Sequence, residues 1–115
     1  MKRGDVYTAV FAFPDGSSAK SRPMLVVQAN FYNSRIRKVL LATITSNLSR
    51  QHDPAHLLID IATADGNATG LRQNSLVSCL NIVVLPQADL VQKIGELSDD
   101  LMWKVDDCLK AAFGI

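Results

Sequence analysis

Two short polar motifs stand at the ends of apolar segments and could bind a phosphate together. Ser21-Arg22-Pro23 places an arginine directly before one apolar segment, and Thr45-Ser46 places two hydroxyls directly after the next. If the two segments are neighbouring antiparallel strands, the start of one meets the end of the other, and Arg22 lies beside the hydroxyls. A guanidinium can hold two phosphate oxygens and a hydroxyl a third. The residues alone also allow a surface arginine in a salt bridge and an ordinary Thr-Ser turn.

Other catalytic designs find little support in the sequence. It contains no Gly-x-x-x-x-Gly-Lys phosphate loop, no His-Glu-x-x-His zinc motif and no Gly-x-Ser-x-Gly nucleophile turn. His52 and His56 are separated by Pro54, which argues against a shared helix face, and a third metal ligand is lacking. Glu96 is the single glutamate, so no pair of glutamates can serve as acid and base. We therefore expect neither a metal nor a cofactor.

The composition is that of one folded domain spanning residues 1–115. Hydrophobic residues make up 48% of the chain and charged residues 20%, the balance of a globular protein. No apolar run approaches the roughly 20 residues of a membrane helix, and no signal-peptide pattern follows Met1. Cys79 and Cys108 lack the spacing of a redox pair and are expected to be small core residues. We expect a cytoplasmic protein.

The charges are distributed unevenly along the chain. Residues 1–50 carry eight Lys or Arg against two Asp, a net +6, whereas residues 51–115 carry four Lys or Arg against nine Asp or Glu, a net −5. A basic half is a candidate surface for an anionic partner, above all a nucleic acid. The alternative is that charge simply segregates between loops and a solvated helix.

Hydrophobic patterning predicts a mainly β fold that ends in a helix. Six β-prone segments alternate with turns such as Pro14-Asp15-Gly16, namely residues 5–13, 23–28, 38–45, 56–61, 75–85 and 91–97. Residues 75–85 are expected to form one long strand or two shorter ones. Ser98 is a good N-cap, and an apolar stripe of helical period follows at Leu101, Val105, Cys108, Leu109, Ala112 and Phe113. Gly114 suits the end of that helix. We predict a small, strongly bent antiparallel barrel capped by the C-terminal helix.

In its ordered motifs the chain resembles the MazF/PemK-like toxins of bacterial type II toxin–antitoxin systems. The matching segments, in order, are Arg3-Gly4-Asp5-Val6, Ser21-Arg22-Pro23, Thr45-Ser46, Gly70-Leu71 with Ser75-Leu76-Val77, and Lys93-Ile94-Gly95-Glu96-Leu97-Ser98. The resemblance implies an SH3-like antiparallel barrel with a C-terminal helix, the fold shared by CcdB- and PemK-like plasmid-maintenance toxins. It also implies a homodimer, a MazE-like antitoxin as partner, and metal-independent cleavage of single-stranded RNA by 2′-hydroxyl attack on the adjacent phosphate.

The same resemblance assigns roles to individual residues. Arg22 would stabilise the phosphate in the transition state, Thr45 would contact or position it, and Ser46 lies adjacent. The loop formed by residues 15–21 would cover the substrate. The side chains expected to meet the RNA phosphates or the RNA itself are Lys20, Arg50, Arg72 and His52.

One departure from the family pattern concerns the strand after Ser75-Leu76-Val77. Many members carry an acidic residue and then an arginine there, at positions that correspond to Leu80 and Val83 in this chain. Proton transfer would then fall to another group, such as His52 or a water molecule, or the enzyme would be slow. The rival interpretation is a non-catalytic barrel that binds RNA or protein, or that poisons a gyrase as CcdB-type toxins do.

Overall fold

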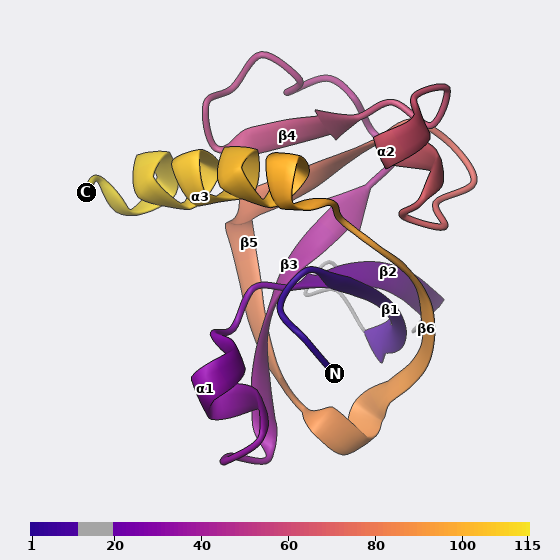
Figure 1. Ribbon diagram of the computed structural model, residues 1–115. Helices are drawn as coiled ribbons and strands as arrows, with labels where there is room; N and C mark the ends of the chain where they lie inside the picture. The colour runs from indigo at the N-terminus through magenta and orange to yellow at the C-terminus, as the bar shows by residue number, and fades with distance from the viewer. Residues whose placement is uncertain (12–19) are drawn as a thin grey trace.

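The computed structural model of the protein describes residues 1–11 and 20–115 (Figure 1). Its elements, in chain order, are β1 (Asp5–Phe11), β2 (Lys20–Val26), α1 (Asn30–Asn33), β3 (Lys38–Thr45), β4 (His56–Ile59), α2 (Ala64–Asn67), β5 (Ser75–Pro86), the 3-10 turn η1 (Gln87–Asp89), β6 (Leu90–Glu96) and α3 (Asp99–Phe113). The predicted turn at Pro14-Asp15-Gly16, the end of the predicted strand 5–13 and most of the loop 15–21 lie outside the described residues.

The strands form one antiparallel sheet that curls but does not close. Their order is β4-β5-β3-β2-β1-β6, so β4 and β6 are the two edges. The mainly β fold with a C-terminal helix is confirmed, whereas full barrel closure is not, because in the described part of the chain the two edge strands do not pair with each other. Figure 1 shows α3 lying across β4 and β5, with β6 and β1 on the other side of the curl.

Side-chain alternation along the strands divides the core into two clusters. The helix-side cluster lies between the sheet and α3, and its buried members are Val6, Leu25, Ala42, Ile44, Ile59, Val77, Cys79, Leu97, Met102, Val105 and Cys108. The sheet-side cluster lies on the other face, and its buried members are Ala9, Met24, Val26, Val39 and Leu41. Each of β1, β2 and β3 contributes alternate residues to the two clusters, so the sheet is apolar on both faces where it is most curved.

A bulge in β5 exchanges the faces of that strand. Val77 and Val83 are an even number of positions apart, yet Val77 belongs to the helix-side cluster and Val83 packs against the sheet-side cluster. The cause is visible in the pairing, which jumps from Ser78 to Ile82 between consecutive residues of β3. Residues 79–81 are therefore extra, and such a bulge re-aims the side chains that it carries. The two halves of β5 therefore contribute to different core clusters, the first to the helix-side cluster and the second to the sheet-side cluster.

The second strand begins earlier than its hydrophobic run suggests. β2 already includes Lys20, Ser21 and Arg22, so Pro23 lies inside the strand rather than at its first position, and Arg22 is in a strand rather than in a loop. Pro23 pairs with Thr8 of β1, whereas pairing with β3 starts only at the next residue. The missing proline N–H is therefore tolerated, because this part of β2 has a strand neighbour on one side only.

The terminal helix confirms its predicted caps and most of its predicted stripe. Ser98 Oγ accepts a hydrogen bond from the N–H of Leu101 at 3.2 Å, and Gly114 adopts a left-handed φ of 72° after the last turn. Phe113 was predicted to lie on the buried stripe but is 65% exposed, whereas Met102 is buried against the sheet. The stripe is therefore shifted toward the N-terminus of α3, where the sheet underlies it. None of the helices among the described residues has the length and apolar character needed to cross a membrane.

Cys79 and Cys108 are buried free thiols of the helix-side cluster, as predicted. Burial raises the pKa of Cys79 from 9.0 to about 12 and also raises the pKa of Cys108. Because the thiolate is the reactive form, we expect neither thiol to react with a soluble disulfide reagent in the folded protein at mildly alkaline pH. Both thiols should react once urea unfolds the chain. Rapid labelling of the native protein would contradict the burial of these side chains.

Candidate active site

The register of β2 and β3 brings Arg22 to Thr45. Met24 pairs with Thr43 in an antiparallel ladder, and the same register extended by two residues places Arg22 opposite Thr45. The predicted hairpin relation of the two segments is therefore confirmed. Arg22 is half-buried, because its side chain leaves a strand of the sheet.

Polar residues continue the apolar rows of the sheet-side cluster. On β3, Leu41 belongs to that cluster, and Thr43 and Thr45 follow it on the same face of the strand. On β2, Met24 belongs to the cluster and Arg22 is the next residue on its face. On this face, the side chains of β2 and β3 are therefore apolar along most of the two strands and polar at one end of the sheet. That change places a polar site against a packed apolar support.

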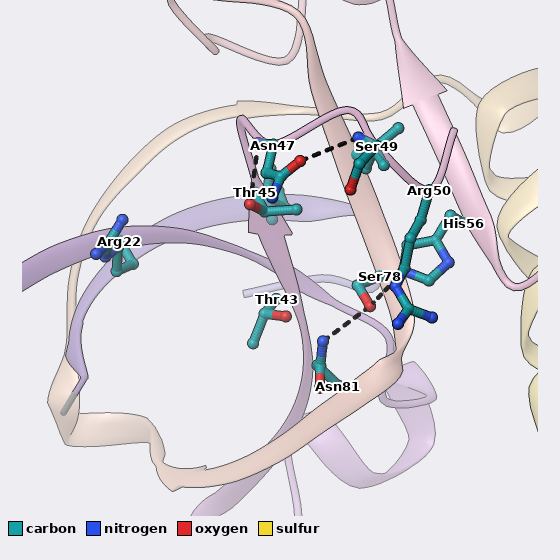
Figure 2. A pocket seen from close by; sticks show the side chains of 11 residues that line it. Arg22, Thr43, Thr45, Asn47, Ser49, Arg50, His56, Ser78 and Asn81 are labelled. Carbon is teal, nitrogen blue, oxygen red and sulfur yellow. Dashed lines mark hydrogen bonds between the residues drawn. The ribbon is translucent and has the colours of Figure 1, made fainter. Parts of the chain in front are cut away.

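A pocket of about 410 Å³ opens at this polar end and is called here the β3–β5 pocket. β2 supplies Arg22, β3 supplies Thr43 and Thr45, and the loop after β3 supplies Arg50. β4 and β5 supply a further polar wall, formed by His56, Ser78 and Asn81. Figure 2 shows Arg22 on one side of this pocket, with the histidine and Arg50 on the other and the β3 threonines between them.

Local hydrogen bonds hold the hydroxyl of Thr45 in a defined position. Thr45 Oγ1 accepts from the backbone N–H of Asn47 at 3.1 Å, and Asn47 Oδ1 accepts from the N–H of Ser49 at 3.0 Å. These successive turns are the local interactions that Thr and Asn side chains favour after a strand. Because Oγ1 already accepts the Asn47 bond, its own hydrogen can be donated to a ligand in the pocket. Thr45 is therefore suited to donate to a phosphate oxygen.

Ser46 faces a different hollow from Thr45. A second pocket of about 590 Å³, called here the β2–β6 pocket, is lined by Arg22, Ser46, Arg72 and residues of β1 and β6. Arg22 lines both pockets, whereas Thr45 lines only the first and Ser46 only the second. The single cradle predicted from the sequence is thus two hollows that share one guanidinium. A polymer with successive phosphates and bases matches such an arrangement better than a compact ligand.

Of the other predicted site residues, two line a pocket and two do not. Arg50 lines the β3–β5 pocket and Arg72 lines the β2–β6 pocket. Lys20 is exposed at the first position of β2. His52 is exposed on a turn and is not among the residues that line either pocket.

The strand positions at which the family pattern expects charge carry no ionisable group. Leu80 is 52% exposed on the β5 bulge. Val83 packs against the sheet-side cluster. Neither side chain can accept a proton, so a carboxylate base is missing at this strand.

The sequence analysis missed a polar network around His56. His56 is the first residue of β4 and pairs in register with Ser78 of β5. Its Nε2 lies 3.0 Å from Ser78 Oγ, and its Nδ1 lies 3.4 Å from Asp53 Oδ1. The N–H of Ala55 donates to Asp53, and this bond, together with His56, keeps the pKa of the Asp53 carboxyl below its ordinary value. Ser78, in the middle of the otherwise apolar run 76–80, was the signal available in the sequence.

Groups that could bind a metal are dispersed. In residues 1–11 and 20–115, no three His, Cys, Asp or Glu side chains come together as a metal ion would require.

Comparison with known proteins identifies the family. Residues 2–113 match the family described as PemK-like, MazF-like toxin of type II toxin–antitoxin system. The chain belongs to this family. Within it, the chain is 37% identical over 112 residues to the protein named endoribonuclease MazF6 of Mycobacterium tuberculosis strain H37Rv, covering 96% of this chain and 94% of the relative. It is 30% identical over 116 residues to endoribonuclease EndoA of Bacillus subtilis, covering 100% and 96% of the two chains.

Solved structures agree on the fold of the family. An endoribonuclease in complex with its cognate antitoxin, from a mycobacterial species, superposes with a TM-score of 0.80. Its sequence is 23% identical, and the match covers 100% of this chain and 96% of that one. The antiparallel sheet with a C-terminal helix is therefore the fold of that solved structure as well.

Proposed function

We propose that the protein is a toxin that cleaves single-stranded RNA as an endoribonuclease. The observation that carries the proposal is the meeting of Arg22 and Thr45, which come from different strands, in one polar pocket. A guanidinium and an oriented hydroxyl are the groups that stabilise charge on phosphate oxygens. Family membership supports the same activity, since the relatives are named endoribonucleases.

The reaction is an in-line transfer within the RNA chain. The ribose 2′-oxygen attacks the adjacent phosphorus, the bond from phosphorus to the 5′-oxygen breaks, and that oxygen takes up a proton. Arg22 donates to the two non-bridging oxygens as negative charge develops on them, and Thr45 donates to one of them. Leu80 and Val83 offer no base, so water in the open pocket takes the proton of the 2′-hydroxyl. Catalysis then rests on alignment and on electrostatic stabilisation.

The RNA chain binds along the two pockets that share Arg22. The β3–β5 pocket and the β2–β6 pocket hold the nucleotides that flank the phosphate bound by Arg22. Arg50 in the first pocket and Arg72 in the second meet the neighbouring phosphates, and Lys20 extends the basic surface at the start of β2. Exposed cations of this kind add affinity that falls as salt concentration rises.

The toxin acts in the cytoplasm as a homodimer and is restrained by an antitoxin. One structural neighbour is titled as an endoribonuclease in complex with its cognate antitoxin. The net charge of +6 on residues 1–50 suits an acidic antitoxin segment that covers the RNA site. An edge strand of the sheet and exposed apolar side chains such as Val91 and Trp103 are available for contacts between subunits.

End-group analysis tests the proposed reaction. Purified protein is incubated with mixed-sequence RNA in the presence of EDTA, and the product ends are identified. We expect cleavage at short preferred sequences, with a 2′,3′-cyclic phosphate on one fragment and a 5′-hydroxyl on the other. Ends of the opposite type, a 3′-hydroxyl and a 5′-phosphate, would contradict the 2′-hydroxyl mechanism. Absence of cleavage by well-folded protein would favour the non-catalytic binding barrel.

A further inference from the structure

We propose that Asn81 reads the nucleobase that enters the β3–β5 pocket, and that the buried side chains of Ser78 and His56 set the direction in which its amide points. The inference rests on the proposed RNA substrate and adds to it a specificity-determining residue. Asn81 is exposed and lines the same pocket as Arg22 and Thr45. A base held there adjoins the phosphate on which those two residues act.

The β5 bulge is what brings Asn81 into the pocket. Cys79 lies in the helix-side cluster, Leu80 is exposed, and Asn81 completes the extra segment before pairing with β3 resumes at Ile82. The backbone N–H of Cys79 donates to the carbonyl of Ala55 at 3.0 Å, which ties the bulge to the segment before β4. A regular strand would place residue 81 on the other face. The bulge therefore contributes Cys79 to the core and Asn81 to the pocket.

A chain of hydrogen bonds runs from Asn81 into the protein. Asn81 Nδ2 donates to Ser78 Oγ at 3.1 Å, and Ser78 Oγ lies 3.0 Å from His56 Nε2. Asp53 Oδ1, 3.4 Å from His56 Nδ1, favours the tautomer with the proton on Nδ1, so that Nε2 is an acceptor. Ser78 then donates its hydrogen to Nε2 and can only accept from the amide. The chain thus holds Asn81 with Nδ2 toward Ser78 (Figure 2).

Burial separates the residue that contacts RNA from the residues that position it. Ser78 is 1% exposed and His56 is 9% exposed, so both offer an RNA base little surface, whereas Asn81 is exposed in the same pocket. The imidazole is therefore a positioning group rather than the base that takes the 2′ proton. Asn81 Oδ1 and its second Nδ2 hydrogen remain for the ligand.

An amide held in one direction distinguishes two classes of base edge. Adenine and cytosine present an amino group beside a ring acceptor, whereas guanine and uracil present a carbonyl beside a ring N–H. An amide can pair with either class, but its acceptor and donor must exchange places between the two. A freely rotating amide would accept both classes, whereas one whose Nδ2 is held by Ser78 favours one class. Contacts of this kind typically discriminate bases by about tenfold or more.

The test compares base preference at every position around the cleaved bond. Randomised RNA is incubated separately with wild type, Asn81→Ala, Ser78→Ala and a control variant, and the fragment ends are sequenced. The control is Asn67→Ala, because Asn67 lies on α2 outside both pockets. We expect Asn81→Ala to lose about tenfold of the preference at one position while the others persist. Ser78→Ala should relax the same position, although its side chain does not touch RNA. The control should match wild type.

Binding to an uncleavable pool separates this inference from the proposed nuclease activity. Randomised single-stranded DNA lacks the 2′-hydroxyl, so selection on it reports base preference whether or not the protein cuts RNA. Loss of preference at one position for Asn81→Ala in this selection supports the reading role even if wild type proves inactive on RNA. The proposed role of Asn81 would be overturned if Asn81→Ala kept the wild-type base preference at every position of the selected DNA. It would also be overturned if Asn81→Ala cleaved all RNA sequences more slowly but kept the wild-type base preference.

Discussion

Arg22→Ala is expected to reduce RNA cleavage by about 100-fold or more while leaving the protein folded. Arg22 lines both pockets and, among residues 1–11 and 20–115, is the one cation that they share. Removing it takes away the charged donor aimed at the phosphate at the moment when charge develops there. Initial cleavage rates on a fixed RNA measure the effect, and a circular dichroism melt checks the fold.

Matched variants separate phosphate stabilisation from loss of net charge. Arg37→Ala removes the same charge from a position outside both pockets and should leave the cleavage rate near that of wild type. Arg22→Lys should recover little activity, because an ammonium cannot bind two phosphate oxygens in the manner of a planar guanidinium. Thr45→Ala should cost less than Arg22→Ala, since a neutral donor stabilises an anion less than a charged one. Full activity in a folded Arg22→Ala protein would contradict the assignment of Arg22 to the active site.

The sequence predicted those parts of the fold that depend on local pattern. Alternating side chains identified β3 with its bounds, and the serine N-cap and the glycine C-cap identified α3. Short elements such as α1, α2 and η1 were missed because four residues or fewer carry no periodicity. β4 ends at Ile59 rather than at residue 61, because the register with β5 stops there. Closure of the barrel could not be decided, since it depends on long-range pairing that no local signal encodes.

In the candidate site, too, the residues that local motifs mark could be predicted, whereas those that long-range structure brings together could not. The placement of Arg22 and Thr45 in one pocket could be predicted because motifs marked both residues and the antiparallel register of β2 and β3 brings their strand ends together. The opposite placement of Ser46 follows from strand alternation, which separates neighbouring residues onto different faces. Asn81 was missed because the β5 bulge that brings it into the pocket cannot be recognised from the β-prone segment 75–85. His56 was missed because it joins the pocket through long-range pairing with Ser78. His52, which the sequence analysis named beside water as a substitute base, does not line this pocket, whereas His56 does.

Gly70→Ala is expected to destabilise the fold by about 2–5 kcal/mol. Gly70 adopts a φ of +75°, and an added Cβ would lie 1.9 Å from the carbonyl oxygen of Ile94 in β6. The same segment is tied to β6 by the N–H of Glu96, which donates to the carbonyl of Ala68 at 3.1 Å. The loop can therefore neither accept the methyl group nor easily move away from it. Because the loop leads to Arg72 in the β2–β6 pocket, its displacement should also weaken RNA binding.

Gly114→Ala provides the matched control for backbone strain. Gly114 has nearly the same φ, +72°, but nothing lies within 4 Å of an added Cβ. Its substitution should cost only the left-handed conformation, about 1 kcal/mol. The difference between the two urea unfolding midpoints, at equal slopes, then measures the clash with β6 alone. Equal shifts for both variants would mean that the loop yields freely, and that the close packing of residues 68–70 on β6 does not hold the wall of the second pocket in place.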